Sequence, residues 1–196
     1  SNTMAGKEYG IPVSGTMAHS WVMSFEDELE SFRSYAGMYP ENTVLLIDTY
    51  DTLGSGIDNA VIVGKELKEQ GRNFGVRLDS GDLQYLSEKV RARLDAEDLT
   101  DAFIVVSNDL NEEVIRQLVS ENAPIDLWGV GTQLVTGGSD SSLTGVYKLV
   151  AREADGEFQP VIKVSNHPEK TTNPGIKQVY RFYDSNDAPL GDLMCL

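Results

Sequence analysis

The sequence predicts an α/β fold in which parallel strands alternate with helices and a small β-rich segment follows. Short apolar runs rich in β-branched residues recur through residues 1–144, and segments with the spacing of amphipathic helices separate them. Nearly continuous apolar strands between such helices require parallel pairing, because the helices then cover the sheet. From about residue 145 onward, alternating runs and turn residues replace this pattern. We therefore expect two parts, residues 1–144 and residues 145–196.

The first part is expected to contain five parallel strands. Each is a short apolar run, and after each of the first four comes a segment with apolar residues three or four positions apart. The expected strands are residues 11–13, 43–47, 74–78, 103–106 and 125–128, the expected helices are residues 21–32, 60–67, 83–94 and 114–119, and residues 1–9 resemble the end of an earlier helix that Gly10 closes.

The second part is expected to consist of antiparallel strands joined by turns, because apolar and polar residues alternate between clusters of turn-forming residues. The expected strands are residues 147–152, 161–164 and 178–183, and the expected loops and turns are residues 137–142, 173–175 and 184–187.

Two architectures fit five parallel strands with their helices. An open doubly wound sheet is complete at five strands, whereas a barrel needs eight strands and usually about 250 residues. The length of 196 residues favours the open sheet. However, the sequence begins in mid-helix and reaches Leu196 without a run that closes a sheet, which favours a portion of a barrel.

Composition and charge exclude several classes of function. The chain has 16 basic and 31 acidic residues, and its formal charge of −15 disfavours a general binder of nucleic acids or anionic membranes. No apolar run approaches the roughly 18 to 20 residues that span a bilayer. The single cysteine, Cys195, has no partner for an internal disulfide, which suits a reducing compartment. We expect a cytoplasmic protein.

Polar, glycine-containing or acidic clusters follow all five expected strands. Because the carboxyl ends of parallel strands share one edge, these clusters are expected to converge on one pocket. The alternative is that Ser, Asn, Asp and Gly there only cap the helices that follow. The clusters are residues 14–16 with His19 behind them, 48–51, 77–82, 107–110 and 129–132.

The last two clusters are candidates for a phosphate site. Gly129 and Gly131 allow a ligand close to the backbone, and the start of the next helix, at Thr132, adds amide donors. Ser107 and Asn108 would supply further donors. The pattern has little specificity by itself, because a Gly-x-Gly sequence occurs by chance and the full dinucleotide fingerprint is absent.

Arg77 is the one cation at an expected strand end, where it would clamp a carboxylate or a phosphate. An ion pair with Asp79 or Asp82 is the alternative. Together with Asp48 and Asp51, these two aspartates form an acidic edge that suits magnesium held beside substrate phosphates. Solvated turn aspartates explain the same pattern, and spacing alone does not separate the two interpretations.

His19 is the candidate catalytic residue. It lies at an expected loop-to-helix junction, where a neutral imidazole would act as a base or a nucleophile. A structural histidine is the alternative. The other histidine, His167, precedes Pro168 in a loop and carries no functional signal.

Five motifs together resemble those of nicotinate phosphoribosyltransferases. They occur in the order and approximate spacing of that family, and five ordered motifs are more specific than any one of them. The tail from Lys163 to Arg181 resembles the segment that follows the barrel in those enzymes, so the match extends over nearly the whole chain. The motifs are GTMAHSW (residues 15–21), LIDTYDT (46–52), RLDSGD (77–82), SNDL (107–110) and GVGT (129–132).

This resemblance implies a type II phosphoribosyltransferase, with an irregular (β/α) barrel and a smaller domain built from both chain ends. Such enzymes join nicotinate to phosphoribosyl pyrophosphate in NAD biosynthesis, giving nicotinate mononucleotide and pyrophosphate with coupled ATP hydrolysis. It also implies Mg²⁺ with phosphoribosyl pyrophosphate, ATP as a co-substrate and a homodimer, and it assigns no metal ligand. By the same resemblance, His19 is the phosphorylated histidine, Arg77, Asp79, Ser80 and Gly81 bind substrate, and Ser107, Asn108, Gly129, Gly131 and Thr132 surround the 5′-phosphate.

The chain departs from the family in its length, because members of the family are considerably longer than 196 residues. We therefore expect this portion alone to have little or no transferase activity. Two alternatives stay open: a non-catalytic phosphate-binding α/β module, and a sibling transferase that uses nicotinamide or quinolinate.

Overall fold

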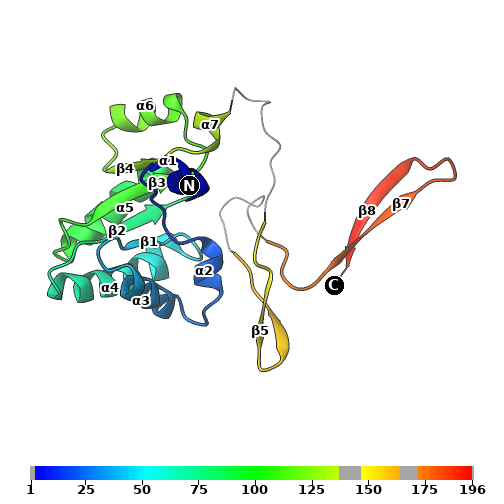
Figure 1. The fold of residues 1–196 in the computed structure, drawn as a ribbon, viewed down its shortest axis with the longest axis horizontal. Coiled ribbons are helices and arrows are strands. Elements are labelled where there is room, and N and C mark those ends of the chain that lie inside the picture. Colours follow the sequence, from blue (N-terminus) through cyan, green and yellow to red (C-terminus); the bar gives the residue numbers. More distant parts are fainter. Residues whose placement is uncertain (1–2, 137–146, 164–171, 196) are drawn as a thin grey trace.

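The computed structural model describes residues 3–136, 147–163 and 172–195. Its main part is a parallel sheet in the order β1-β2-β3-β4, so the strands lie side by side in the order in which the chain makes them. Figure 1 shows the helices around this sheet and two hairpins apart from it. The strands are β1 (Val44–Leu46), β2 (Gly75–Leu78), β3 (Phe103–Ser107) and β4 (Leu127–Gly129).

A helical segment follows each of these strands, as parallel connections require. The helices are α1 (Thr3–Tyr9), α2 (His19–Met23), α3 (Glu28–Met38), the π-helical turn η1 (Thr52–Gly56), α4 (Ile57–Glu69), α5 (Leu83–Ala96), α6 (Glu112–Ser120) and α7 (Thr132–Val135). The helix α4 packs beside both α3 and α5, and α5 lies against β2 and β3.

The core lies where these helices cover the sheet. All three residues of β1 are buried, and β2 is nearly so, which is the burial expected of parallel strands covered by helices. Burial of such aliphatic side chains contributes about 1.5 to 3 kcal/mol each. The fully buried residues include Phe32, Leu45, Leu46, Ile47, Val76, Leu78, Val90, Leu94, Ile104 and Val106.

The expected strand at residues 11–13 is wrong. Ile11 and Val13 are about half exposed, and the described sheet begins at β1. A strand needs a neighbour that accepts its backbone hydrogen bonds, and this segment instead lies against α1. A Cβ added to Gly6 of α1 would overlap the side chain of Val13. The described parallel sheet therefore has four strands rather than five.

The helix expected over residues 21–32 is two helices. Asp27 ends the continuity, because its side chain accepts a hydrogen bond of 3.0 Å from the backbone N–H of Glu30 and caps α3. The two helices stay in contact, since the indole N–H of Trp21 in α2 donates to the carbonyl of Ser31 in α3 at 3.0 Å. The helices expected at residues 60–67, 83–94 and 114–119 are confirmed by α4, α5 and α6, and the helix closed by Gly10 is confirmed by α1.

The β-rich character of the second part is confirmed, with shifted bounds for one hairpin. Antiparallel strands β5 (Ala151–Ala154) and β6 (Glu157–Pro160) replace the expected strands at residues 147–152 and 161–164, because Asp155 and Gly156 adopt the positive φ angles of a tight turn. Strand β7 (Gln178–Tyr183) is as expected and pairs with β8 (Pro189–Cys195). The turn at residues 184–187 joins them. The loop expected at residues 137–142 and His167 lie outside the described residues.

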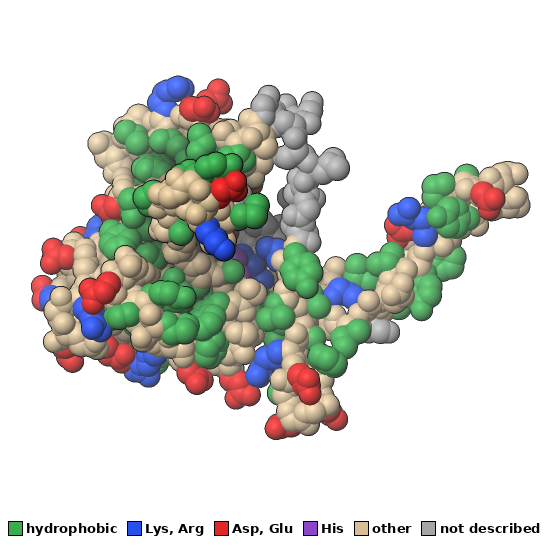
Figure 2. All heavy atoms as spheres, in the orientation of Figure 1, with side chains coloured by type: hydrophobic (Ala, Val, Ile, Leu, Met, Phe, Trp, Pro, Cys, Tyr) green, Lys and Arg blue, Asp and Glu red, His purple; other side chains and the backbone are tan. Residues whose placement is uncertain are grey.

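The hairpin β7–β8 projects from the rest of the molecule, and exposed apolar side chains, green in Figure 2, lie along it among polar and charged ones. None of the described helices has the length and apolar composition needed to cross a membrane.

Candidate functional site

Side chains from four separate segments meet at the carboxyl edge of the sheet. His19 begins α2, Thr49 follows β1, Asp79 follows β2 and Ser107 ends β3. The register brings these strand ends together, because Leu46 is opposite Arg77, and Leu78 is opposite Val106 one position before Ser107. The expected convergence of the loops is confirmed for these segments.

Arg77 joins three of the segments. Its Nε donates to Ser107 Oγ at 2.9 Å, and its Nη2 donates to Asp79 Oδ1 at 3.1 Å. Its Nη1 donates to Thr16 Oγ1 at 2.5 Å and to the carbonyl of Met17 at 3.2 Å. Of the two ion pairs weighed from the sequence, the one with Asp79 is formed. The planar guanidinium thus fixes the relative positions of β2, β3 and the segment before α2.

Asp79 is the electrostatic centre of the cluster. Its Oδ1 accepts from Ser107 Oγ at 2.5 Å as well as from Arg77, and its Oδ2 lies 3.5 Å from Nε2 of His19. Burial raises the pKa of the Asp79 carboxyl, but the interactions with His19, Ser107 and Arg77 outweigh burial and hold that pKa well below its usual range. Asp79 is therefore an anion at neutral pH.

His19 is held on both edges of its ring. Nδ1 lies 3.1 Å from Thr49 Oγ1, and Nε2 faces Asp79 without a hydrogen-bond partner in the described part of the chain. The side chain is only 12% exposed. The imidazole is thus largely shielded from solvent and oriented between a hydroxyl and an anion.

Asp48 carries an unsatisfied carboxylate oxygen. Its Oδ2 accepts from the backbone N–H of Asp79 at 3.1 Å and from the hydroxyl of Ser80. Its Oδ1 is buried and has no hydrogen-bond partner within residues 3–136, 147–163 and 172–195. A buried anionic oxygen without a partner costs free energy, which a cation or a ligand hydroxyl would recover.

The residues present fit a magnesium ion only in company with a ligand. The described residues contain no group of three or more His, Cys, Asp or Glu side chains that would hold a metal ion alone. However, Mg²⁺ is usually held by one or two carboxylates together with waters and substrate phosphates. Asp48, whose Oδ1 lacks a partner among the described residues, supplies one such carboxylate.

The other two aspartates of the acidic edge are helix caps. Asp51 Oδ1 accepts from the backbone N–H of Gly54 at 3.0 Å, and Asp82 Oδ1 accepts from that of Tyr85 at 3.0 Å. The capping interpretation is therefore the right one for these two residues. Gly81, just before Asp82, has φ of 82°, where glycine is favoured.

The predicted phosphate loops are only partly brought into the cluster. Ser107 is opposite Gly129 in the β3–β4 register, and a Cβ on Gly129 would lie 3.2 Å from Cβ of Ser107, so the strands approach closely there. Asn108 follows with φ of 98°. Gly131 and Thr132 lie at the start of α7 and are exposed, and no contact found among the described residues joins them to the cluster.

Two residues of the cluster were not singled out from the sequence. Thr16 accepts from Arg77, and Thr49 bonds His19. Both lie in motifs that follow expected strands, and this position is the one feature of the sequence that indicates a place in the site. A threonine in a loop predicts a cap as readily as a contact to another segment.

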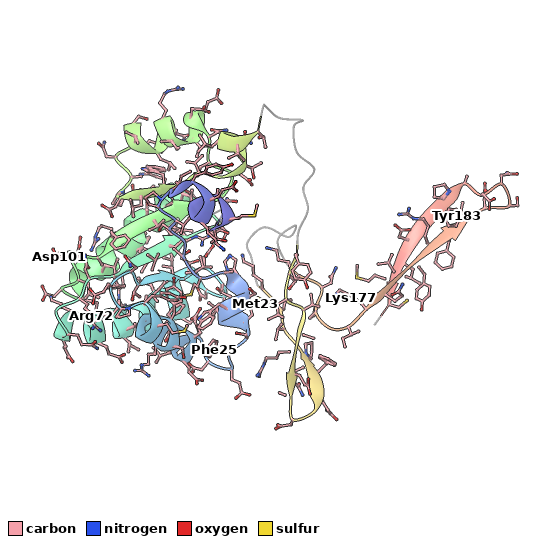
Figure 3. All side chains as sticks on the ribbon, in the orientation of Figure 1. Met23, Phe25, Arg72, Asp101, Lys177 and Tyr183 are labelled. Atoms are coloured by element: carbon pink, nitrogen blue, oxygen red, sulfur yellow. The ribbon has the colours of Figure 1, made fainter. Side chains whose placement is uncertain are left out.

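Two cavities formed by described residues lie elsewhere. One, of about 600 Å³, lies at the amino ends of β2 and β3 and is lined by Arg72 and Asp101, which Figure 3 labels far from α2. The second, of about 510 Å³, lies between Met23, Phe25 and the β5–β6 hairpin.

The fold and this cluster define a class of protein: a parallel α/β protein that has a histidine, an arginine and two carboxylates at the carboxyl edge of its sheet. A family model described as the nicotinate phosphoribosyltransferase (NAPRTase) family matches residues 1–188. The chain belongs to this family.

Comparisons with individual relatives agree with this family assignment. The chain is 49% identical over 197 residues to nicotinate phosphoribosyltransferase of Bacillus subtilis, a match that covers 100% of this chain and 40% of the relative. The crystal structure of human nicotinic acid phosphoribosyltransferase is similar with a TM-score of 0.58 at 26% sequence identity, covering 100% of this chain and 45% of that chain. The structure of nicotinate phosphoribosyltransferase from Porphyromonas gingivalis, at 22% identity and a TM-score of 0.63, covers 87% of this chain and 46% of that one and shows the same fold. The chain thus spans less than half the length of these relatives.

Proposed function

We propose that the full-length protein transfers the phosphoribosyl group of phosphoribosyl pyrophosphate to nicotinate, giving nicotinate mononucleotide and pyrophosphate for NAD biosynthesis. The observation that carries the proposal is the cluster of His19, Arg77, Asp79 and Ser107, which brings together residues from three of the five motifs.

The reaction needs positioning more than a covalent protein nucleophile. The pyridine nitrogen of nicotinate is unprotonated near neutral pH and attacks the anomeric carbon, and the bond from that carbon to the pyrophosphate oxygen breaks with its electron pair. Arg77 donates four hydrogen bonds within the protein, which hold its guanidinium group in place. In this proposal its positive charge attracts the carboxylate of nicotinate or a phosphate. Asp79, as an anion, accepts hydrogen bonds from ribose hydroxyls.

The close approach of β3 and β4 supports a place for the 5′-phosphate. Ser107 lies opposite Gly129 across the sheet and Asn108 follows it, and the absence of a side chain on Gly129 allows this close approach of the two strand ends. In this proposal Gly131 and Thr132 complete the phosphate loop, and Ser80 and Gly81 shape the substrate side of the site.

Coupling to ATP is the second element of the proposal. A neutral His19 accepts the γ-phosphoryl group: a nitrogen–phosphorus bond forms, the bond to the β-phosphate oxygen breaks, and ADP leaves with the electron pair. The phosphorylated ring then carries about two negative charges beside Asp79 and Arg77. The resulting rearrangement of these charges favours substrate binding.

Magnesium belongs to the proposal because Asp48 has a buried carboxylate oxygen without a partner among the described residues. Asp48 would hold the ion together with the substrate phosphates, and its Oδ1 would gain the partner that it lacks. When bound, the ion neutralises charge on the leaving pyrophosphate.

The larger assembly is also proposed. We infer that β1–β4 are one arc of a (β/α) barrel, since β1 and β4 each have a free edge within the described residues. Residues 1–144 then belong to the barrel and residues 145–196 to the smaller domain of a cytoplasmic homodimer. We expect the 196-residue chain alone to have little activity, because it spans 40% of the Bacillus subtilis relative.

The test uses the full-length protein. Purified enzyme is supplied with phosphoribosyl pyrophosphate, Mg²⁺ and either nicotinate, nicotinamide or quinolinate, with and without ATP, and the mononucleotide formed is measured. Formation of nicotinate mononucleotide, stimulated by ATP, supports the proposal. A preference for another pyridine assigns a sibling activity, and binding of phosphoribosyl pyrophosphate without turnover assigns a non-catalytic module; either result overturns the proposal.

A further inference from the structure

Asp48 accepts both of its described hydrogen bonds on one carboxylate oxygen. Oδ2 accepts from the backbone N–H of Asp79 at 3.1 Å and from the hydroxyl of Ser80, whereas Oδ1 is buried and has no partner among the described residues. The whole residue is only 4% exposed. Two donors on the same oxygen hold the plane of the carboxylate, so the other oxygen has one defined position.

The hydroxyl of Ser80 is fully used by this contact. Ser80 is itself only 8% exposed, and a hydroxyl has a single proton, which Ser80 donates to Asp48. The ligands proposed for this edge of the sheet, phosphates and the carboxylate of nicotinate, accept hydrogen bonds and do not donate them. Ser80 therefore has no proton left for these ligands while it holds Asp48.

We propose that Ser80 is a positioning residue: together with the backbone N–H of Asp79 it occupies Oδ2 of Asp48 and so leaves Oδ1 as the oxygen that receives the metal ion. This inference rests on the proposed function, in which Asp48 holds Mg²⁺. It assigns Ser80 an effect on the site through Asp48 rather than through contact with substrate. Groups that orient a metal-binding carboxylate strengthen the binding of the metal.

The loop after β2 is built to bring both donors to the same oxygen. At its start, Asp79 is held by the hydrogen bond of 3.1 Å from Nη2 of Arg77. Gly81 then turns the chain with φ of 82°, and Asp82 caps α5. Ser80 lies between these fixed points, so its hydroxyl is oriented before a ligand arrives.

Two variants of the full-length enzyme separate positioning from general stability. Ser80→Ala removes the hydroxyl and leaves Asp48 with one described donor, the backbone N–H of Asp79. Ser87→Ala is the matched control, because Ser87 is also buried and donates its hydroxyl to the carbonyl of Gln84 at 3.0 Å. It makes the same chemical change in the helix that follows the same loop.

The first measurement is the strengthening of pyrophosphate binding by Mg²⁺. Calorimetric titration of each protein with inorganic pyrophosphate, once with Mg²⁺ and once with EDTA, gives two dissociation constants, and their ratio is the enhancement. Loss of a group that orients a metal ligand typically weakens metal binding by about 10- to 100-fold. One donor remains on Asp48, so we expect the enhancement to fall about tenfold in Ser80→Ala. Ser87→Ala should keep the wild-type enhancement. No fall in Ser80→Ala, or an equal fall in Ser87→Ala, overturns the proposal.

A double-mutant cycle with Asp48→Ala shows whether the effect passes through the carboxylate. Asp48→Ala removes both the oxygen proposed to bind the metal and the acceptor of the Ser80 hydroxyl. We therefore expect that adding Ser80→Ala to Asp48→Ala causes no further loss of pyrophosphate affinity in the presence of Mg²⁺. A second loss of about tenfold means that Ser80 contacts the ligand itself, which overturns the proposal.

Unfolding of the metal-free enzyme distinguishes a failure of this inference from a failure of the proposed function. The proteins of the cycle are unfolded by denaturant in EDTA, and their midpoints are compared. The shift caused by Ser80→Ala should be smaller in Asp48→Ala than in the wild-type enzyme, because the hydrogen bond between the two side chains is already lost. Equal shifts overturn the proposal. If Mg²⁺ does not strengthen pyrophosphate binding to the wild-type enzyme, the proposed role of magnesium fails instead, and the unfolding cycle still decides whether Ser80 holds Asp48.

Discussion

Ser107 donates a hydrogen bond of 2.5 Å from its hydroxyl to Oδ1 of Asp79, although the two residues are 28 positions apart. The same hydroxyl accepts from Nε of Arg77 at 2.9 Å. One small side chain at the end of β3 therefore completes the charge pair at the end of β2. The parallel register makes this contact available, because Leu78 lies opposite Val106.

Replacement of Ser107 by alanine is expected to destabilise the protein in a pH-dependent way. The pKa of Asp79 is lowered in the folded state, so Asp79 contributes stability above the unfolded pKa of about 3.9, and this contribution is lost as pH falls toward the folded pKa. Without the hydroxyl the folded pKa moves up toward the ordinary value, and we expect a loss of about 1 kcal/mol at pH 7. Denaturant unfolding at several pH values checks this. The difference from wild type should shrink below about pH 4, and a difference that is constant with pH would contradict the assignment.

Replacement of His19 by alanine is expected to remove ATP stimulation. The imidazole is the proposed phosphoryl acceptor, and its neighbours Thr49 and Asp79 offer no nitrogen nucleophile. In the full-length enzyme the ratio of rates with and without ATP should fall to about one, and acid-labile phosphate from labelled ATP should no longer appear on the protein. Stimulation that persists in His19→Ala excludes this histidine as the acceptor.

Replacement of Arg77 by lysine is expected to reduce kcat/KM for transfer by about 100-fold, since an ammonium group cannot make several charge-assisted hydrogen bonds in a planar fork. Ser107, Thr16 and Asp79 would lose a common partner. Arg72→Lys is the control, because Arg72 forms an exposed pair with Glu41 at 3.3 Å near the amino end of β2. The control should stay within about twofold of wild type. Similar losses in both variants would contradict a specific role for Arg77.

Replacement of Asp48 by asparagine is expected to raise the Mg²⁺ concentration needed for half-maximal activity. The change keeps the shape of the side chain and removes the charge at the oxygen that lacks a partner. Asp51→Asn is the control, since Asp51 caps η1 and an asparagine also caps. Removal of Mg²⁺ by EDTA should abolish transfer in all three proteins. An unchanged Mg²⁺ dependence in Asp48→Asn would exclude this carboxylate from metal binding.

The sequence by itself determined the alternation of four strands and their helices. The apolar runs around Leu45, Val76, Ile104 and Trp128 and the helical spacing between them depend on side-chain periodicity, which is local. It also placed a polar cluster behind each strand, because the carboxyl ends of parallel strands lie at one edge whatever their neighbours are. Position also singled out His19 and Arg77, and the family resemblance then implied a role for each.

Tertiary structure alone decided which polar residues face one another. Asp48 and Asp51 are three residues apart in one motif, yet Asp48 is buried against Ser80 while Asp51 caps η1. The hydroxyl of Thr49 meets His19 only because the loop after β1 folds against the start of α2. Residues 11–13 have the composition of a strand but lie against α1. Periodicity fixes the faces of a helix or a strand, whereas these contacts depend on register and on packing between segments about 30 residues apart, which no local pattern contains.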